Sequence, residues 1–313
     1  MRMCPARATV ALAVGLITAA ALPACGTGAT RQQASSATVV ASTNVWGSVA
    51  RTVTGDRVSV RTILADPAAD PHSFQASPSD AAAILGAAVV VYNGGGYDSW
   101  VDKVLAGRPG IRSIDAYSFL SPDRTPDGHA NASPANEHVF YDLNVAKSVA
   151  TAIAEQLAAI DADNTEGYRA NAAAFGQGAD AIAASERAIA DAHNGAAVIA
   201  TEPVARYLLS ATGLTDRTPP AFATATENDA DPSPADMAAV LDLIKRRQVA
   251  AVLLNPQTST TATAGVRDAA RGTGVPIVEV AESPPTGSDY LAWQRDTVAR
   301  LAAALGSGHS DAH

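Results

Sequence analysis

Four side chains stand out because their types and places suit the binding of a divalent cation. His72 lies in the loop 66–74 (DPAADPHSF), just after an apolar segment, and His138 lies in the loop 136–142 (NEHVFYD). Glu202 and Glu282 each follow an apolar segment in the second half of the chain. A carboxylate that directly follows a strand is well placed to face a cleft, and this pattern occurs twice. A single loop histidine is a weak signal by itself, so the positions of all four must be explained by the fold.

Short apolar segments alternate with Ala-rich helical segments, which predicts an α/β fold with mostly parallel sheets. In the first half we predict strands at Thr38–Ser42, Val58–Leu64, Ala88–Tyr92 and Ile111–Ile114, with helices near 46–54, 78–85 and 97–105. In the second half we predict strands at Ala196–Ala200, Ala221–Ala225, Ala250–Leu254 and Ile277–Val280, with helices near 204–212, 234–247, 260–272 and 290–305. Helical patterns at 144–160 and 165–193 lie between the two halves.

We therefore expect two α/β lobes, each a mostly parallel sheet flanked by helices, joined by one long rigid helix. The N-terminal lobe is expected over residues 38–160, the linking helix over 161–193 and the C-terminal lobe over 194–306, with a tail at 307–313. A chain of 313 residues suits two lobes because single cores rarely grow beyond about 250–300 residues. Two open parallel sheets leave a cleft at the carboxyl ends of their strands, where ligands bind.

The first residues predict export and lipid anchoring. Arg2 and Arg7 precede an apolar run, Val10–Leu22, which is shorter than the roughly 20 residues of a membrane-spanning helix. The segment that follows (LPACG) resembles a bacterial lipobox, with Cys25 as the lipidated residue. Residues 1–24 would then be a signal peptide and 25–37 a tether, the alternative being an ordinary signal peptide with an incidental cysteine. Cys4 is the only other cysteine, so no thiol remains for a metal site.

Charge and motifs exclude several classes of protein. The chain has 31 acidic and 22 basic residues, a formal charge of −9, which argues against nucleic-acid binding. The sequence contains no Gly-x-Ser-x-Gly, His-Glu-x-x-His or phosphate-binding glycine motif. Two histidines and a carboxylate could form the metal site of an oxygenase or a hydrolase, so a metal-dependent enzyme is one alternative. A surface adhesin is the other.

At this point the chain resembles the solute-binding lipoproteins of bacterial zinc and manganese ABC transporters, over about Thr38 to Leu305. The matching segments are the lipobox, DPHSF (70–74), EHVFYD (137–142) with the long helix that follows, TEPV (201–204), NPQT (255–258) and GSDYLAW (287–293). The resemblance implies a metal between the lobes with one ligand from each of four loops. Those ligands would be His72, His138, Glu202 and Glu282.

The resemblance also leaves some points open. The family usually has Asp before Ser at the fourth position, where this chain has Glu282, so Asp289 is an alternative fourth ligand. Tyr141 and Asp142 are candidates for orienting His138. Zinc-specific members often have a third histidine where this chain has Glu202, and oxygen ligands suit Mn²⁺, yet Zn²⁺ has the higher intrinsic affinity. The cargo is therefore predicted as Zn²⁺ or Mn²⁺.

In functional terms, the resemblance implies capture of a metal rather than catalysis. We expect a monomer that delivers Zn²⁺ or Mn²⁺ to an ABC permease and its ATPase. Lipid on Cys25 would hold it on the outer face of the cytoplasmic membrane. Protons should compete with the metal for His72 and His138, so affinity should fall at low pH. A single long helix between the lobes predicts a small movement on loading.

Overall fold

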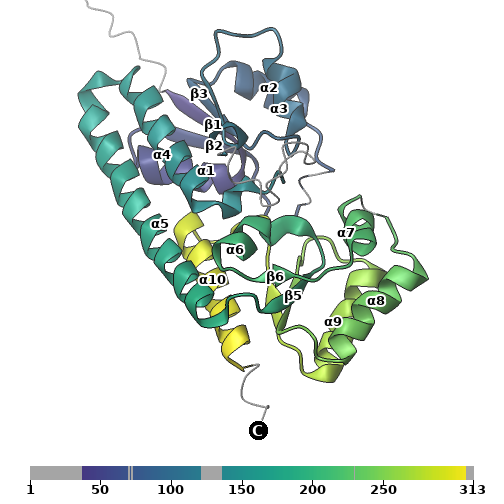
Figure 1. Ribbon diagram of the computed structural model, residues 1–313. Coiled ribbons are helices and arrows are strands. Elements are labelled where there is room, and N and C mark those ends of the chain that lie inside the picture. Colours follow the sequence, from purple (N-terminus) through teal and green to yellow (C-terminus); the bar gives the residue numbers. More distant parts are fainter. Residues whose placement is uncertain (1–36, 70, 72, 121–135, 229, 308–313) are drawn as a thin grey trace, which may run out of the picture. The chain divides into compact units, whose positions relative to one another are not determined.

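The computed structural model describes residues 37–69, 71, 73–120, 136–228 and 230–307. Within these ranges the chain forms two four-stranded parallel sheets with the orders β2-β1-β3-β4 and β6-β5-β7-β8 (Figure 1). Their strands are β1 (Thr38–Thr43), β2 (Ser59–Leu64), β3 (Val89–Tyr92), β4 (Ser113–Asp115), β5 (Ala197–Ala200), β6 (Thr215–Asp216), β7 (Ala251–Leu254) and β8 (Ile277–Glu279). The α/β prediction with two parallel sheets is confirmed, and β3 and β7 occupy equivalent places.

Alternate residues of each strand face opposite layers of helices, as a parallel sheet covered on both sides requires. In the first sheet Val39 and Val91 pack with α1 (Asn44–Thr54) and α4 (Leu143–Ala158). Val40 and Val90 face the other way, toward α2 (Pro78–Leu85) and α3 (Ser99–Leu105). The inner strand β3 is therefore buried along its whole length.

The second sheet repeats this arrangement. One face packs against α6 (Arg206–Ala211) and α10 (Tyr290–Ser307). The other face packs against α7 (Pro220–Glu227), α8 (Pro234–Lys245) and α9 (Thr261–Thr273). Side chains from both sheets, among them Val39 and Leu253, belong to one continuous hydrophobic core. This shared core explains why Ser36–His313 forms a single compact unit.

The long helix predicted at 165–193 is present as α5 (Thr165–His193). It contacts α1, α4, α6 and α10, and so packs beside helices of both sheets (Figure 1). Its buried residues Tyr168, Phe175, Ile182 and Ile189 recur at intervals of seven, which keeps one face of the helix on the core. The predicted linking range began at 161; residues Ala162–Asn164 form a separate 3₁₀ turn.

One predicted strand is wrong. Ala221–Ala225 lies within the helix α7, and the edge strand at this place is the two-residue β6. Pro220 at the first helical position and the alanines that follow favour a helix. The short apolar run resembled a buried strand only because strand and helix segments of that length have the same composition.

Local signals set the ends of several helices. Ser77 and Asp80 form a capping box at α2, and Thr260 and Thr263 form one at α9. Further 3₁₀ turns occur at Tyr117–Phe119, Val139–Tyr141 and Pro203–Ala205. Among the helices that the structure describes, none is both long and apolar enough to span a membrane. The predicted signal peptide, Cys25, His72 and most of the C-terminal tail lie outside the described residues.

Candidate metal site

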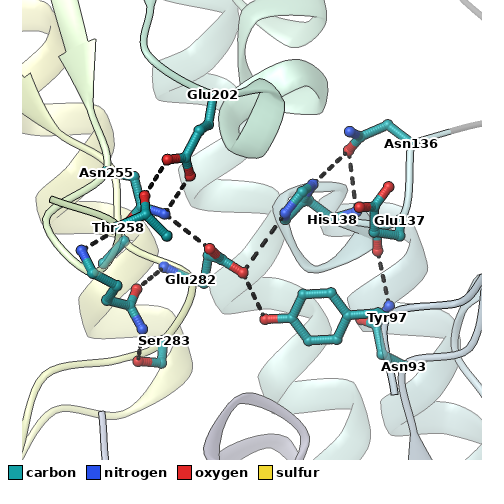
Figure 2. Close-up of polar contacts among 12 residues, drawn as sticks. Asn93, Tyr97, Asn136, Glu137, His138, Glu202, Asn255, Thr258, Glu282 and Ser283 are labelled. Atoms are coloured by element: carbon teal, nitrogen blue, oxygen red, sulfur yellow. Dashed lines mark hydrogen bonds and ion pairs between the residues drawn. The ribbon is translucent and has the colours of Figure 1, made fainter. Parts of the chain in front are cut away.

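Three of the four predicted ligands lie in loops that meet beside the two sheets (Figure 2). Glu202 follows β5 by two residues and Glu282 follows β8 by three. Because the carboxyl ends of parallel strands lie at the same edge of a sheet, both glutamates are placed at the carboxyl end of β7, which β5 and β8 flank. His138 comes from the first half of the chain and precedes the turn Val139–Tyr141. Its side chain faces Glu282 from the first half of the chain.

His138 and Glu282 face each other across the two halves of the chain. Nε2 of His138 lies 3.6 Å from Oε2 of Glu282, and the two side chains are 3% and 1% exposed. The imidazole ring makes edge contacts with the rings of Tyr97 and Phe140. The Tyr97 hydroxyl donates a 3.0 Å hydrogen bond to Glu282 Oε2. These contacts hold one imidazole and one carboxylate at a buried point where either could bind a cation.

Asn136 sets the orientation and tautomer of His138. Oδ1 of Asn136 accepts the backbone N–H of His138 at 3.0 Å, which identifies this atom as the amide oxygen. Nδ1 of His138 lies 3.1 Å from the same oxygen and therefore donates to it. In the neutral ring Nε2 is then the nitrogen that carries the lone pair, and it faces Oε2 of Glu282. A histidine that donates from one nitrogen and offers the other is the form that binds metals.

Asn255 links the two glutamates. It directly follows β7, and its Nδ2 donates to Glu202 Oε2 and Glu282 Oε1, each at 2.8 Å. The other oxygen of Glu202 accepts the hydroxyl of Thr258. Burial raises the pKa of Glu202, and the nearby Glu282 raises it further, while the hydrogen bonds from Thr258 and Asn255 oppose the rise. The site therefore contains two buried carboxyl groups that one amide holds together.

The same loop connects this acidic pair to the first half of the chain. Oε1 of Gln257 accepts the backbone N–H of Glu282 at 2.6 Å, and its Nε2 donates to the carbonyl of Pro67 at 3.0 Å. The Ser283 hydroxyl also donates to the Pro67 carbonyl at 3.0 Å. Pro67 belongs to the loop in which His72 was predicted as a ligand. Ser283 and Gln257 thus anchor that loop near the glutamates.

The structure separates the predicted residues into three groups. His138, Glu202 and Glu282 come together, and His72 lies outside the described residues. Asp289 is exposed at the start of α10, where its Oδ1 accepts the N–H of Ala292 at 2.7 Å. In the described ranges no group of three or more His, Cys, Asp or Glu side chains is arranged to hold one ion. Glu202 is turned toward Thr258, whose hydroxyl its Oε1 accepts.

The candidates for orienting His138 have other roles. Asp142 caps α4 by accepting the N–H groups of Asn144 and Val145. The Tyr141 hydroxyl donates to the carbonyl of Ala281, one residue before Glu282, at 2.7 Å. Asn136 contacts both the backbone N–H and the ring of His138, and the sequence reasoning missed it. The one available signal was its place two residues before His138, since asparagine readily accepts nearby backbone N–H groups.

Several solved structures share this fold. The laminin-binding protein of Streptococcus agalactiae, described as having adhesin and metal-transporting activity, superposes with a TM-score of 0.71 at 22% identity, covering 86% of this chain and 99% of that one. The periplasmic zinc-binding protein TroA from Treponema pallidum gives 0.72 at 18% identity, covering 86% and 99%. At these identities the likeness concerns the fold alone.

Two curated relatives are similar in sequence. The manganese-binding lipoprotein MntA of Halalkalibacterium halodurans is 27% identical over 50% of this chain and 51% of its own length. The manganese transporter lipoprotein PsaA of Streptococcus pneumoniae is 26% identical over 53% and 54%. The chain thus spans about half the length of the curated relatives it matches. The family model described as zinc-uptake complex component A, periplasmic, matches residues 39–304, so the chain belongs to that family.

Proposed function

We propose that this protein is an extracytoplasmic lipoprotein that captures Zn²⁺ or Mn²⁺ and delivers it to an ABC permease powered by an ATPase. The observation that carries the proposal is the convergence of His138, Glu282 and Glu202 from three separate loops. A neutral imidazole and two carboxylates balance the charge of a dication, which makes burial of the ion feasible. The family membership supports a role in metal uptake rather than catalysis.

The proposed ligands are His72, His138, Glu202 and Glu282. Glu282 is favoured over Asp289 because it is 1% exposed beside His138, whereas Asp289 is exposed and caps α10. Gln257 and Ser283 anchor Pro67, which lies near the start of the loop 66–74, close to the acidic pair. This anchoring supports His72 of the same loop as a ligand. Binding would require the Glu202 carboxylate to turn from Thr258 toward Glu282. That is a side-chain rotation and needs no rearrangement of the sheets.

We further propose that residues 38–160 and 194–306 act as two lobes joined at 161–193. Each range contains one complete sheet, and α5 packs beside helices of both. The continuous core between the sheets opposes a large hinge motion, so loading should produce a small change. We also propose that lipid on Cys25 holds the protein on the outer face of the cytoplasmic membrane. We propose that it acts there as a monomer. The family description as a periplasmic uptake component supports the location.

Metal titration of the purified protein tests the function. We expect His72→Ala and Glu202→Ala each to lower the affinity for Mn²⁺ and Zn²⁺ by at least about tenfold, without unfolding the protein. Isothermal titration calorimetry measures this, with circular dichroism as the check on folding. Glu279→Ala is the matched control, because Glu279 is an exposed carboxylate three residues before Glu282 and should bind metal like the wild type. Unchanged affinity in both ligand variants would refute the assignment.

A further inference from the structure

Asn255 is a buried amide whose orientation is fixed by the backbone around it. The residue is 1% exposed, and its own N–H donates to the Thr201 hydroxyl at 3.2 Å. Its Oδ1 accepts the backbone N–H of Gln257 at 3.0 Å. Because a backbone N–H can only donate, the atom facing Gln257 must be the amide oxygen. The NH₂ group therefore points to the opposite side, where the two glutamates lie.

Both hydrogens of this NH₂ group are used by carboxylates. One bond goes to Glu202 and the other to Glu282, each at 2.8 Å, and these two residues come from the loops after β5 and β8 (Figure 2). A hydrogen bond to an ionised group is stronger than one between neutral groups. When both carboxyl groups are ionised, one neutral donor contacts two like charges in a low-dielectric interior, where their mutual repulsion is large.

We propose that Asn255 is a positioning residue that holds Glu202 and Glu282 together so that one divalent cation can engage both. This inference rests on the proposed function. Asn255 itself is not a ligand, because its amide oxygen faces Gln257 while its NH₂ group faces the glutamates, and the lone pair of the amide nitrogen is delocalised into the carbonyl. Each carboxylate oxygen can bind a metal with one lone pair while it accepts from Asn255 with another. The amide thus removes part of the cost of bringing the two charges together before the ion arrives.

One neighbouring residue supports this assignment, since Gln257 accepts the backbone N–H of Glu282. Thr258 donates to the Glu202 oxygen that Asn255 does not contact, and this oxygen would leave Thr258 when Glu202 turns toward the cation. The short segment 255–258 therefore contacts both glutamates at several atoms. Residues of this kind, which contact the ligands and not the metal, typically contribute about 10- to 100-fold to metal affinity.

The test is a double-mutant cycle with MnCl₂ titrated into the chelator-treated full chain. We expect Asn255→Leu, which keeps the volume and removes the donor, to lower the Mn²⁺ affinity by about 10- to 100-fold. In a Glu202→Ala background the same substitution should cost about threefold, because one of its two targets is gone. Asn171→Leu is the matched control, since its amide donates to the Val53 carbonyl and the substitution should leave affinity unchanged.

The outcomes separate this inference from the proposed function. If the wild type binds neither Mn²⁺ nor Zn²⁺, the proposed function fails. If it binds and Asn255→Leu binds equally well, only the positioning role fails. Equal losses in the wild-type and Glu202→Ala backgrounds would also overturn it, because general damage to the fold is additive. If the leucine variant does not fold, Asn255→Ser replaces it under the same criteria. Failure of both to fold would assign Asn255 to folding and overturn the proposal.

Discussion

The two sheets share one strand order, and each places a buried asparagine directly after the equivalent strand, Asn93 after β3 and Asn255 after β7. The two amides are used differently. Asn93 accepts from Nε1 of Trp46 at 3.2 Å and donates to the carbonyls of Gly94 and Glu137. Asn255 instead donates to two carboxylates. The amide at this position thus holds backbone carbonyls in the first half and the carboxyl groups of two side chains in the second half.

The difference matches the ligands that we propose for each half. The first half offers imidazole, which is neutral when it binds a metal and needs only its orientation and tautomer fixed. Asn93 contributes by holding the carbonyl of Glu137, the residue before His138. The second half offers carboxylates, which repel each other and need a donor between them. The two halves have the same architecture, and each positions a different kind of proposed ligand because Asn93 and Asn255 contact different groups.

The largest expected effect is the loss of metal affinity when one proposed ligand is removed from either half, and it should differ between Mn²⁺ and Zn²⁺. Glu282→Ala should lower the Mn²⁺ affinity more than about a hundredfold, above the usual cost of losing an outer-shell partner. His138→Ala should lower the Zn²⁺ affinity by a larger factor than the Mn²⁺ affinity, because imidazole suits zinc and oxygen ligands suit manganese. Calorimetric titration of both metals into both variants gives, for each variant, the ratio of the loss in Mn²⁺ affinity to the loss in Zn²⁺ affinity. If this ratio is the same for Glu282→Ala and His138→Ala, the two halves do not differ in their preference for metal.

The second effect concerns a buried acid of the first half. Asp98 is 1% exposed, accepts the backbone N–H groups of Asn93 and Gly94, and its pKa is raised by burial to about 6. Its pKa in the unfolded chain is near the ordinary value of 3.8. The folded protein therefore binds more protons between these values. The contribution of Asp98 to the unfolding free energy should therefore be greatest below pH 4. It should fall by roughly 2–3 kcal/mol as the pH rises past 6.

Urea unfolding at pH 4, 5, 6 and 7 measures this dependence for the wild type and for Asp98→Asn. The asparagine variant does not titrate, so the difference in unfolding free energy between the two proteins should change over this range. A constant difference would place the pKa of Asp98 at its ordinary value and show that burial does not raise it.

The smallest effect tests the alternative fourth ligand. Asp289→Ala should leave the affinities for Mn²⁺ and Zn²⁺ unchanged and should lower the unfolding free energy by about 1 kcal/mol, the usual contribution of a helix cap. Calorimetric titration and thermal unfolding measure the two quantities. A tenfold loss of metal affinity with an unchanged unfolding temperature would instead make Asp289 a ligand and displace Glu282 from that role.

The sequence determined the elements and most of their limits by itself. The helices at 78–85 and 165–193 were predicted with the bounds that the structure has, because a capping signal or a regular spacing of apolar residues marks them. The strands were recognisable as short apolar runs. Ala221–Ala225 was wrong because such a run has no period that separates strand from helix, and Pro220 was the better signal.

The tertiary structure alone decided the environment of the site. The loops of His138, Glu202 and Glu282 lie far apart in the sequence, and their convergence depends on two parallel sheets whose strand ends meet. The roles of Asn136, Asn255 and Tyr97 were absent from the sequence reasoning, since no spacing marks an amide or hydroxyl that contacts a ligand from another loop. Residue types can indicate which metals a site suits, but hydrogen bonds between distant segments determine whether like charges can be held together, and those depend on the folded chain.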